Sequence, residues 1–253
     1  MSETFAAAGG SPDPVSVDAA EVAKFARLAR DWWDPQGPMA ALHRMNPARL
    51  AFIRDRLAPD PGALKPLTGL DLLDLGCGGG LLSEPLARMG ATVVGADATA
   101  ETLEVARRHA AEQGLAIDYR ETTAEALLAK GERFDAVLAL EVVEHVAEPQ
   151  AFLAAAAGLV RPGGQLLLST ISRTAKSFLM AIVGAEWLLR VVPRGTHDWR
   201  RFLTPGELGR LVAAQGLRVA ATQGLVLNPF DRGWRLSDRD LDVNYLMAAE
   251  KPA

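Results

Sequence analysis

Short apolar segments alternate with longer amphipathic segments through most of the chain. The apolar segments have the length of buried strands, and the segments between them repeat apolar residues every three or four positions, as helices do. This alternation predicts an α/β fold with a mostly parallel, seven-stranded sheet and helices on both of its faces. The predicted strands are 70–75, 91–97, 116–120, 134–140, 165–170, 217–227 and 242–249, and the helices joining the first five are 80–89, 100–113, 123–130 and 148–160.

Three segments depart from this alternation. Residues 1–18 are small and polar and include Pro and Gly, so we expect a disordered tail. Residues 19–66 carry two helical patterns and no strand pattern, which predicts an N-terminal helical lid. An insertion at 172–202 follows the fifth strand. We expect residues 19–253 to form one domain, because the length suits a single core with a small addition.

The first strand runs into a glycine-rich turn, Gly76-Cys-Gly-Gly-Gly80, and a helical pattern follows directly. Glycines allow backbone angles that a Cβ would forbid and let a ligand lie against the main chain. The start of the helix offers free N–H groups to the same ligand. The second strand ends at Asp97, and an acidic residue at that distance can bind both hydroxyls of a ribose. We therefore predict a nucleoside-containing ligand at Gly76, Gly78 and Asp97, the alternative being a glycine turn that binds nothing.

The glycine spacing distinguishes two classes of ligand. The dinucleotide fingerprint G-x-G-x-x-G/A fails, because its last position falls on Leu81 or Ser83. Residues 74–80 instead match D-x-G-x-G-x-G, which resembles the S-adenosylmethionine (SAM) site of Rossmann-like methyltransferases. SAM has no pyrophosphate, so the glycines need only make room for its amino-acid end while Asp97 binds the ribose.

Composition and charge bear on the cellular compartment and on the class of partner. The chain has 253 residues, 49% of them hydrophobic, and a net charge of −4, so nothing attracts it as a whole to nucleic acid. A single cysteine, Cys77, excludes an intramolecular disulfide and fits a reducing compartment. We see no secretory signal and no apolar run of the roughly 18 residues typical of a membrane span. We therefore expect a cytoplasmic protein without a nucleic-acid partner.

A cluster of titratable residues follows the fourth predicted strand. Glu141, Glu144 and His145 stand at i, i+3 and i+4, so a helix would place all three on one face. Two carboxylates and an imidazole can hold Mg²⁺, and Mg²⁺ bound to a catechol would lower the pKa of its hydroxyl. We predict Glu141 and His145 as catalytic residues and all three as metal ligands. Two alternatives stay open: His145 acts as a general base without metal, because imidazole titrates near neutrality, or the cluster is purely structural.

Blocks of sequence spread over about 20–250 together resemble the ubiquinone biosynthesis O-methyltransferases. The glycine motif alone would indicate only the SAM-dependent methyltransferase superfamily, whereas the blocks that contain WWD, LHRxNPxR and PxGTHD are far more specific. The blocks are Trp32-Trp33-Asp34, residues 42–49, residues 74–84, Glu141-x-x-Glu144-His145, Lys176-Ser177 with Gly184-Ala185-Glu186, residues 193–198 and Asp242-Val243-Asn244-Tyr245.

The resemblance implies a Rossmann-like SAM-dependent methyltransferase fold and both O-methylations of the ubiquinone head group, on polyprenyl catechol or hydroquinol intermediates. It also implies SAM contacts at Arg49, Gly76, Asp97 and Leu140, where Leu140 stands in place of a commoner Met. Arg49 has a rationale of its own, since a cation from the N-terminal lid would meet the SAM carboxylate. The alternative for Arg49 is a solvated arginine on a helix.

The insertion carries an apolar segment, 178–193, interrupted only by Glu186 and Arg190. It is too short to span a bilayer but suits a membrane interface, because basic residues flank it. We therefore predict that residues 176–198 bind an anionic phospholipid surface and place the protein peripherally on the inner membrane. Other ubiquinone-biosynthesis enzymes are possible partners under the same resemblance. The alternative is an ordinary core helix or a dimer surface.

Other functions remain open at the level of sequence. One is a SAM-dependent C- or N-methyltransferase that acts on another small hydrophobic molecule. Activity on a catechol but not on a monophenol, together with Mg²⁺ dependence, would favour the O-methyltransferase over it. Another is a non-catalytic ligand-binding module or an NAD-dependent dehydrogenase. Calorimetry against SAM and NAD separates these last two from a methyltransferase.

Overall fold

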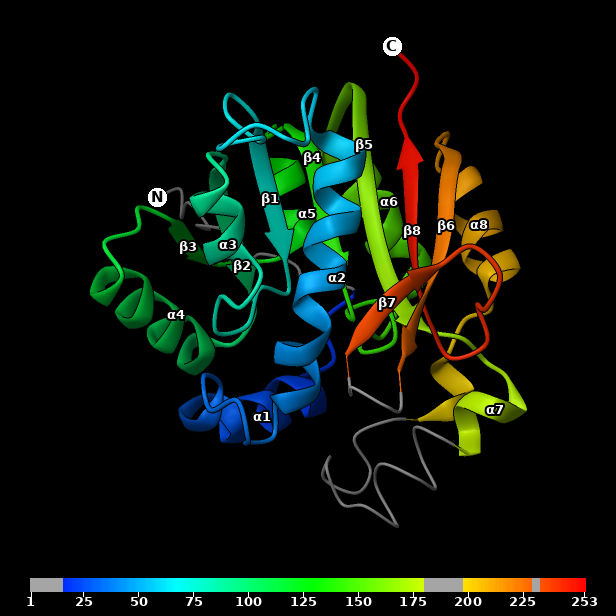
Figure 1. The fold of residues 1–253 in the computed structure, drawn as a ribbon, viewed down its shortest axis with the longest axis horizontal. Helices are drawn as coiled ribbons and strands as arrows, with labels where there is room; N and C mark the ends of the chain where they lie inside the picture. Colours follow the sequence, from blue (N-terminus) through cyan, green and yellow to red (C-terminus); the bar gives the residue numbers. More distant parts are fainter. Residues whose placement is uncertain (1–15, 180–197, 229–232) are drawn as a thin grey trace, which may run out of the picture.

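Eight strands form one sheet in the order β3-β2-β1-β4-β5-β8-β6-β7 in a computed structural model that describes residues 16–179, 198–228 and 233–253 (Figure 1). The first five strands of that order are parallel, and β8, β6 and β7 each pair antiparallel with their neighbour. The strands are β1 (Asp71–Leu75), β2 (Thr92–Asp97), β3 (Asp118–Glu121), β4 (Phe134–Leu140), β5 (Val160–Ile171), β6 (Arg218–Leu227), β7 (Trp234–Ser237) and β8 (Asn244–Glu250).

The predicted class of fold is confirmed, but the predicted number of strands is wrong by one. The additional strand is β7, which lies at the edge of the sheet and, among the described strands, pairs only with β6. Four residues that alternate Trp-Arg-Leu-Ser are too few to give a strand pattern from sequence alone. The fifth strand is also longer than the predicted 165–170, because Arg161-Pro-Gly-Gly164 is part of β5.

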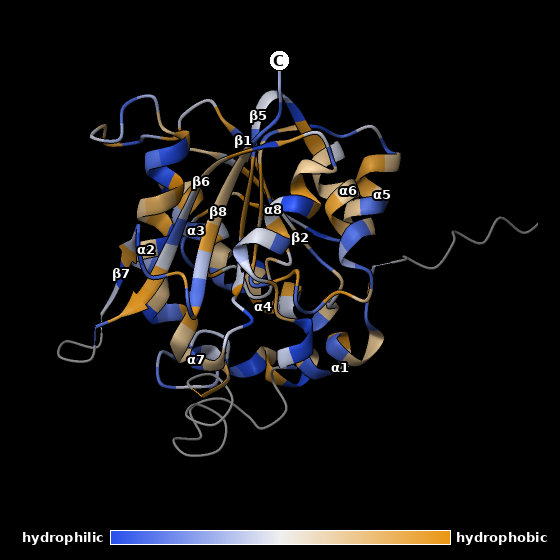
Figure 2. Cartoon of the chain, turned by 90° about the vertical axis from the view of Figure 1, so that its right-hand side faces the viewer, coloured by the Kyte–Doolittle hydropathy of each residue, from blue (hydrophilic) through white to orange (hydrophobic). Residues whose placement is uncertain are grey.

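Helices cover both faces of the sheet, as expected. One hydrophobic cluster joins α5, α6 and α8 to the sheet, and α6 is coloured largely hydrophobic in Figure 2. A second cluster joins α2 and α3 to the opposite face. The helices are α1 (Ala19–Leu28), η1 (Ala29–Asp31), α2 (Ala40–Leu57), α3 (Ser83–Arg88), α4 (Ala100–Glu112), α5 (Ala124–Ala129), α6 (Pro149–Leu159), α7 (Ala175–Ser177), η3 (Trp199–Arg201) and α8 (Pro205–Ala213).

The parallel strands bring the predicted site residues to one edge of the sheet. Leu75 pairs with Ala96 between β1 and β2, and Leu140 pairs with Ser169 between β4 and β5. The glycine turn after β1, Asp97 at the end of β2 and Leu140 at the end of β4 therefore lie along the same edge. In open α/β sheets this edge is where ligands bind.

The N-terminal region divides into two parts. Helix α2 belongs to the core, since Phe52 and Ile53 are fully buried in the cluster that contains Leu72 and Leu138. Helix α1 and η1 instead lie across the ligand-binding edge of the sheet, close to α4 (Figure 1). Of the predicted lid, only this first part covers the site.

The predicted tail and insertion are only partly described. Residues 1–15 of the tail lie outside the described residues, but Ser16 is buried and its carbonyl accepts a hydrogen bond from Ala147 N–H at 2.9 Å, so 16–18 are ordered. Most of the insertion, 180–197, also lies outside them. Among the helices that are described, none has the length and apolar character needed to cross a membrane.

If α2 is part of the core, substitution of its buried face must destabilise the whole domain. Ile53→Ala is expected to lower the free energy of unfolding by about 2–5 kcal/mol, because it removes buried methyl groups and leaves a cavity. Chemical denaturation followed by circular dichroism measures this change. Leu64→Ala is the control, since Leu64 is 96% exposed and its substitution should cost less than about 0.5 kcal/mol. An unchanged unfolding transition for Ile53→Ala would mean that α2 is a separable lid.

Candidate functional site

The glycine turn between β1 and α3 has the backbone that its sequence predicts. Gly76, Gly78 and Gly80 have φ angles of 68°, 51° and 88°, a region that other residues rarely adopt. The N–H of Gly76 donates to the carbonyl of Ala96 at 2.7 Å and fastens the turn to β2. A Cβ on Gly78 would lie 2.1 Å from Cζ2 of Trp32. The absence of side chains therefore admits the Trp32 ring, which is buried against the turn.

Trp33 attaches the N-terminal segment to the same turn. Its Nε1 donates to the carbonyl of Gly79 at 2.9 Å. Its ring stacks on His109 of α4, with centroids 3.5 Å apart and planes 10° apart. The Nδ1 atom of His109 in turn lies 2.6 Å from a carboxylate oxygen of the buried Glu84. The paired tryptophans thus cover the glycine turn from one side.

Asp97 ends β2 and faces the glycine turn. Its Oδ2 accepts the N–H of Gly78 and its Oδ1 accepts the N–H of Thr99, both at 2.8 Å. Burial raises the pKa of Asp97, and these backbone hydrogen bonds oppose the rise without cancelling it. A carboxylate held in this position beside the turn can accept hydrogen bonds from two ribose hydroxyls.

Asp74 has a structural part in the motif. Its side chain is buried within β1 and accepts a 2.6 Å hydrogen bond from the hydroxyl of Ser83 at the start of α3. Burial raises its pKa to about 7, with a further rise from the charge of Asp97. This carboxyl links β1 to α3 across the glycine turn. Asp74, the first residue of the D-x-G-x-G-x-G motif, therefore stabilises the turn through this link.

Arg49 reaches the site from α2 and is only 4% exposed. Its Nη2 lies 3.0 Å from Oε1 of Glu141, but neither Nε nor Nη2 has an aligned hydrogen-bond acceptor among the described residues. Buried donors without an acceptor cost about 1–3 kcal/mol each. An anionic ligand would satisfy them, so the donor set of Arg49 fits the carboxylate at the amino-acid end of SAM.

Glu141 is the first residue after β4 and adopts a φ of 57°, the left-handed region that side chains disfavour. Its Oε1 accepts a 2.6 Å hydrogen bond from the Ser169 hydroxyl and a 3.3 Å bond from Nδ2 of Asn244. Burial by itself raises the pKa of Glu141, but Arg49 and these two donors outweigh burial and lower it. Glu141 therefore stays ionised as the partner of Arg49.

The predicted metal-binding face does not form. Residues 141–145 are a turn, not a helix, and the three side chains face different partners. Glu144 is buried and accepts a hydrogen bond from Thr170 at 2.9 Å, and burial together with the charge of Glu141 raises its pKa to about 7. His145 instead lies 2.8 Å from Glu21 of α1. Within the described part of the chain, no three His, Cys, Asp or Glu residues are grouped so that they could hold a metal ion.

Leu140 completes the predicted set. It is half-buried at the end of β4 and packs against the cluster beneath α2. The strand order β2-β1-β4 places Asp97 and Leu140 on opposite sides of Gly76. A ligand that crosses the glycine turn would meet a carboxylate at one end and an apolar side chain at the other, as a ribose and an adenine ring require.

Sequence reasoning missed several residues of the site. No motif in the sequence points to Glu21 or Ser169. Asn46 lies within the block 42–49 that supports the resemblance, but its role could not be read from that block. Its Nδ2 donates to the carbonyl of Leu81 at 2.7 Å and ties α2 to the residues after the glycine turn. Asn244 also belongs to such a block, but nothing in its spacing predicts contact with Glu141.

Known proteins that are similar to this chain in sequence are methyltransferases. Residues 73–168 match the model of the methyltransferase domain family. A ubiquinone biosynthesis O-methyltransferase from Dinoroseobacter shibae is 56% identical over 94% of this chain and 98% of that protein. One from Ruegeria pomeroyi is 54% identical, with the same coverage of both chains.

Solved structures share the fold. The magnesium protoporphyrin IX methyltransferase of Synechocystis PCC 6803, crystallised with bound SAH, superposes with a TM-score of 0.65 at 22% identity and covers 90% of this chain and 94% of that one. The [4+2]-cyclase SpnF superposes with a TM-score of 0.58 at 18% identity, covering 81% and 82%. A fold that also supports a cyclase does not by itself decide the reaction.

If Asp97 binds the ribose, Asp97→Ala leaves two hydroxyl donors without acceptors, at a cost of about 1–3 kcal/mol. The affinity for SAM should fall roughly tenfold to a hundredfold, as measured by calorimetry on folded protein. Glu121→Ala is the matched control, because Glu121 is the exposed acidic residue that pairs with Asp97 in register between β2 and β3. Equal affinities of the two variants would remove Asp97 from the site.

Proposed function

The chain belongs to the ubiquinone biosynthesis O-methyltransferase family, and on this premise we propose that it methylates the hydroxyls of polyprenyl catechol and hydroquinol intermediates in both O-methylation steps, with SAM as the methyl donor. The similarity over nearly the full length of the chain carries the proposal. The placement of Arg49, Gly76, Asp97 and Leu140 along one edge of the sheet supports it. A C- or N-methyltransferase is the alternative.

Each of the proposed site residues would bind a different part of SAM. Arg49 would bind the carboxylate of SAM, Asp97 its ribose hydroxyls and Leu140 its adenine, with main-chain contacts from Gly76 and Gly78. When bound, SAM supplies a methyl group already activated on a sulfonium. The protein has to align the substrate oxygen with that methyl group and exclude water. Its contribution is therefore mainly to position the reactants.

His145 is the proposed general base. A phenolic oxygen attacks better once its proton leaves, and imidazole is the side chain best suited to receive a proton near neutrality. His145 lies in the turn that follows β4, next to the residues proposed to bind SAM. Glu141 acts indirectly in this proposal, because its carboxylate is engaged by Arg49, Ser169 and Asn244.

A magnesium requirement remains a prediction from sequence that the arrangement of Glu141, Glu144 and His145 does not support. No step of the proposed mechanism passes through a metal. Turnover measured in excess chelator separates the alternatives: full activity leaves His145 to act alone, whereas loss of activity that Mg²⁺ restores would mean that these side chains regroup around an ion.

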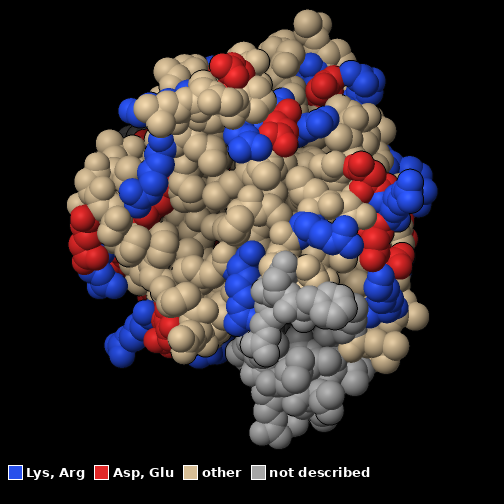
Figure 3. Space-filling view, in the orientation of Figure 1, with Lys and Arg blue, Asp and Glu red and all other residues tan. Residues whose placement is uncertain are grey.

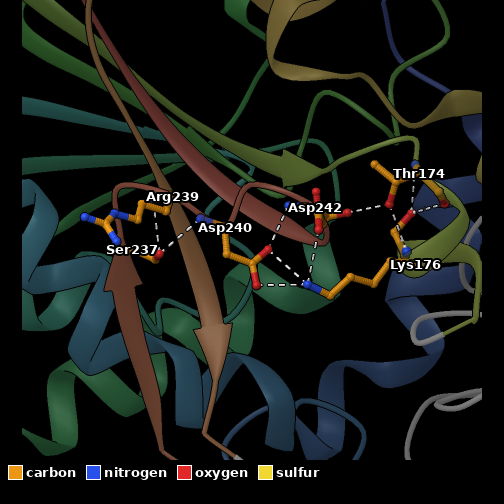
Figure 4. A network of polar contacts seen from close by, with 7 residues as sticks. Thr174, Lys176, Ser237, Arg239, Asp240 and Asp242 are labelled. Carbon is orange, nitrogen blue, oxygen red and sulfur yellow. Dashed lines mark hydrogen bonds and ion pairs between the residues drawn. The ribbon is translucent and has the colours of Figure 1, made fainter.

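We further propose that the protein docks on an anionic membrane surface, where its prenylated substrate would be found. Phe178 and Leu179 support this proposal, because they are 43% and 60% exposed at the described start of the insertion. Lys176, expected to face phospholipid, instead contacts Asp240 at 2.9 Å and Asp242 at 3.3 Å (Figure 4). The attachment proposed here is therefore apolar at Phe178 and Leu179, and residues 180–197 of the predicted surface lie outside the described residues.

Charge gives no reason to test nucleic acid as a partner. On the face seen in Figure 3, Lys and Arg side chains are interspersed with Asp and Glu and do not gather into one basic patch. The net charge of −4 points the same way. Peripheral attachment to the inner membrane, and contact with other enzymes of ubiquinone biosynthesis, belong to the same proposal.

The test of function is turnover of SAM with a prenylated catechol. We expect product with the catechol and none with the matching monophenol. His145→Asn should lower kcat by roughly 10²-fold or more, the usual contribution of a general base, while calorimetry shows SAM binding unchanged. Turnover of the monophenol would favour the alternative methyltransferases, and full activity of His145→Asn would remove the proposed base.

The membrane proposal predicts sedimentation of the intact protein with anionic liposomes. The double variant Phe178→Ser, Leu179→Ser should sediment several-fold less, because it removes apolar area that would enter the interface. Leu64→Ser is the matched control, since Leu64 is an exposed apolar residue elsewhere on the surface. Failure of the intact protein to sediment with any liposome, or equal sedimentation of the two variants, contradicts the proposal.

A further inference from the structure

Trp32 and Trp33 are adjacent and chemically identical, but their indole N–H groups differ in their partners. Nε1 of Trp33 donates to the carbonyl of Gly79 at 2.9 Å. Nε1 of Trp32 is buried, in a residue only 6% exposed, and has no acceptor among the described residues. An indole N–H can only donate, and a buried one usually has an acceptor. The unpaired donor of Trp32 therefore points to a ligand that accepts a hydrogen bond.

The ring of Trp32 lies along the glycine turn. A Cβ on Gly79 would lie 2.4 Å from Cδ1 of Trp32, and a Cβ on Gly78 would lie 2.9 Å from Cε2. Nε1 is bonded to both of these ring carbons, so it lies beside the main chain of the two glycines. The unpaired donor is therefore at the part of the turn that is proposed to bind SAM.

Packing fixes the direction of this donor. Trp32 belongs to a buried apolar cluster that contains Leu81 and Val105 of α4, and the ring of Phe25 lies 6.2 Å away at a tilt of 57°. The carbonyl of Trp32 lies 3.0 Å from Nε2 of His43 on α2. A ring held on several sides loses little further freedom when a ligand binds, so the donor is preorganised.

The carboxylate of SAM is the acceptor that suits this position. The glycines make room for the amino-acid end of SAM, whereas Asp97 is proposed to bind the ribose. Arg49, the residue proposed for the same carboxylate, also has nitrogens without an aligned acceptor among the described residues. A carboxylate has about four acceptor positions on its two oxygens, so it can accept from a guanidinium and an indole together. Hydrogen bonds to a charged acceptor are also the stronger kind.

We propose that Nε1–H of Trp32 donates to the carboxylate of SAM and so selects, together with Arg49, for ligands that carry the amino-acid end. The inference rests on SAM as the methyl donor of the proposed function. Trp33 has a different role, because its N–H is already bonded to the carbonyl of Gly79. One indole of the pair therefore binds the main chain of the turn, and the other binds the ligand.

Calorimetry with two ligands tests this assignment. S-adenosylhomocysteine (SAH) keeps the amino-acid end, whereas 5′-methylthioadenosine lacks it. Trp32→Phe keeps an aromatic ring and removes the N–H, so the affinity for SAH should fall roughly tenfold to a hundredfold, as for loss of a hydrogen bond to a charged group. The affinity for methylthioadenosine should not change. Trp234→Phe is the matched control, because it makes the same substitution on β7 at the far edge of the sheet and should change neither affinity.

The indole signal of Trp32 provides a second readout. Each of the five tryptophans gives one Nε1–H signal in a nitrogen–proton correlation spectrum of the full chain, and the signal of Trp32 is the one missing from Trp32→Phe. SAH should move this proton signal downfield, as a hydrogen bond to a carboxylate does. Methylthioadenosine should leave it near its position in the free protein.

The outcomes separate this inference from the proposed function. Equal affinity of Trp32→Phe and the wild type for SAH, an equal loss of affinity for both ligands, or an indole signal that SAH does not move would each overturn it. Failure of the wild type to bind SAH contradicts the proposed cofactor as well. Loss of SAH affinity in Trp32→Phe together with no turnover of the catechol supports the inference and contradicts only the proposed substrate. If Trp32→Phe does not fold, benzothienylalanine at position 32, which replaces only the N–H by sulfur, is measured in its place.

Discussion

A nearly buried ion pair between Arg49 and Glu141 joins the elements that surround the site. Their side chains are 5% and 15% exposed, and Glu141 also accepts hydrogen bonds from Ser169 of β5 and Asn244 of β8. Helix α2, the end of β4 and two further strands thus meet at one carboxylate. Loss of one member of such a pair costs about 3–5 kcal/mol, because the other charge stays buried without a partner.

The same pair bears on the strain at Glu141 and on the unsatisfied hydrogen-bond donors of Arg49. A left-handed φ on a residue with a side chain costs about 1–3 kcal/mol and persists only where the surroundings enforce it. The charge of Arg49 and the hydrogen bonds from Ser169 and Asn244 provide that enforcement. Because two nitrogens of Arg49 still lack an aligned acceptor among the described residues, the pair is electrostatically favourable yet leaves hydrogen-bonding capacity for a ligand.

The N-terminal helices make the second set of connections, between the two halves of the site. Trp32 and Trp33 contact the glycine turn, and Glu21 contacts the turn that holds His145. One short stretch of chain therefore touches both the residues proposed to bind SAM and the proposed base.

The sequence by itself determined the doubly wound sheet, the glycine turn and the position of Asp97, because strand periodicity, glycine backbone angles and the spacing between two adjacent strands are local properties. The start of α8 is local in the same sense, because Thr204 and Glu207 exchange hydrogen bonds within one helical turn. Only the tertiary structure decided the partners of Glu141, Glu144 and His145. A helical face was expected there, but Arg49, Thr170 and Glu21 draw the three side chains apart, and each of these partners lies at least 26 positions away in the sequence. Contacts between such distant residues depend on how whole elements pack, which no local pattern of residues encodes.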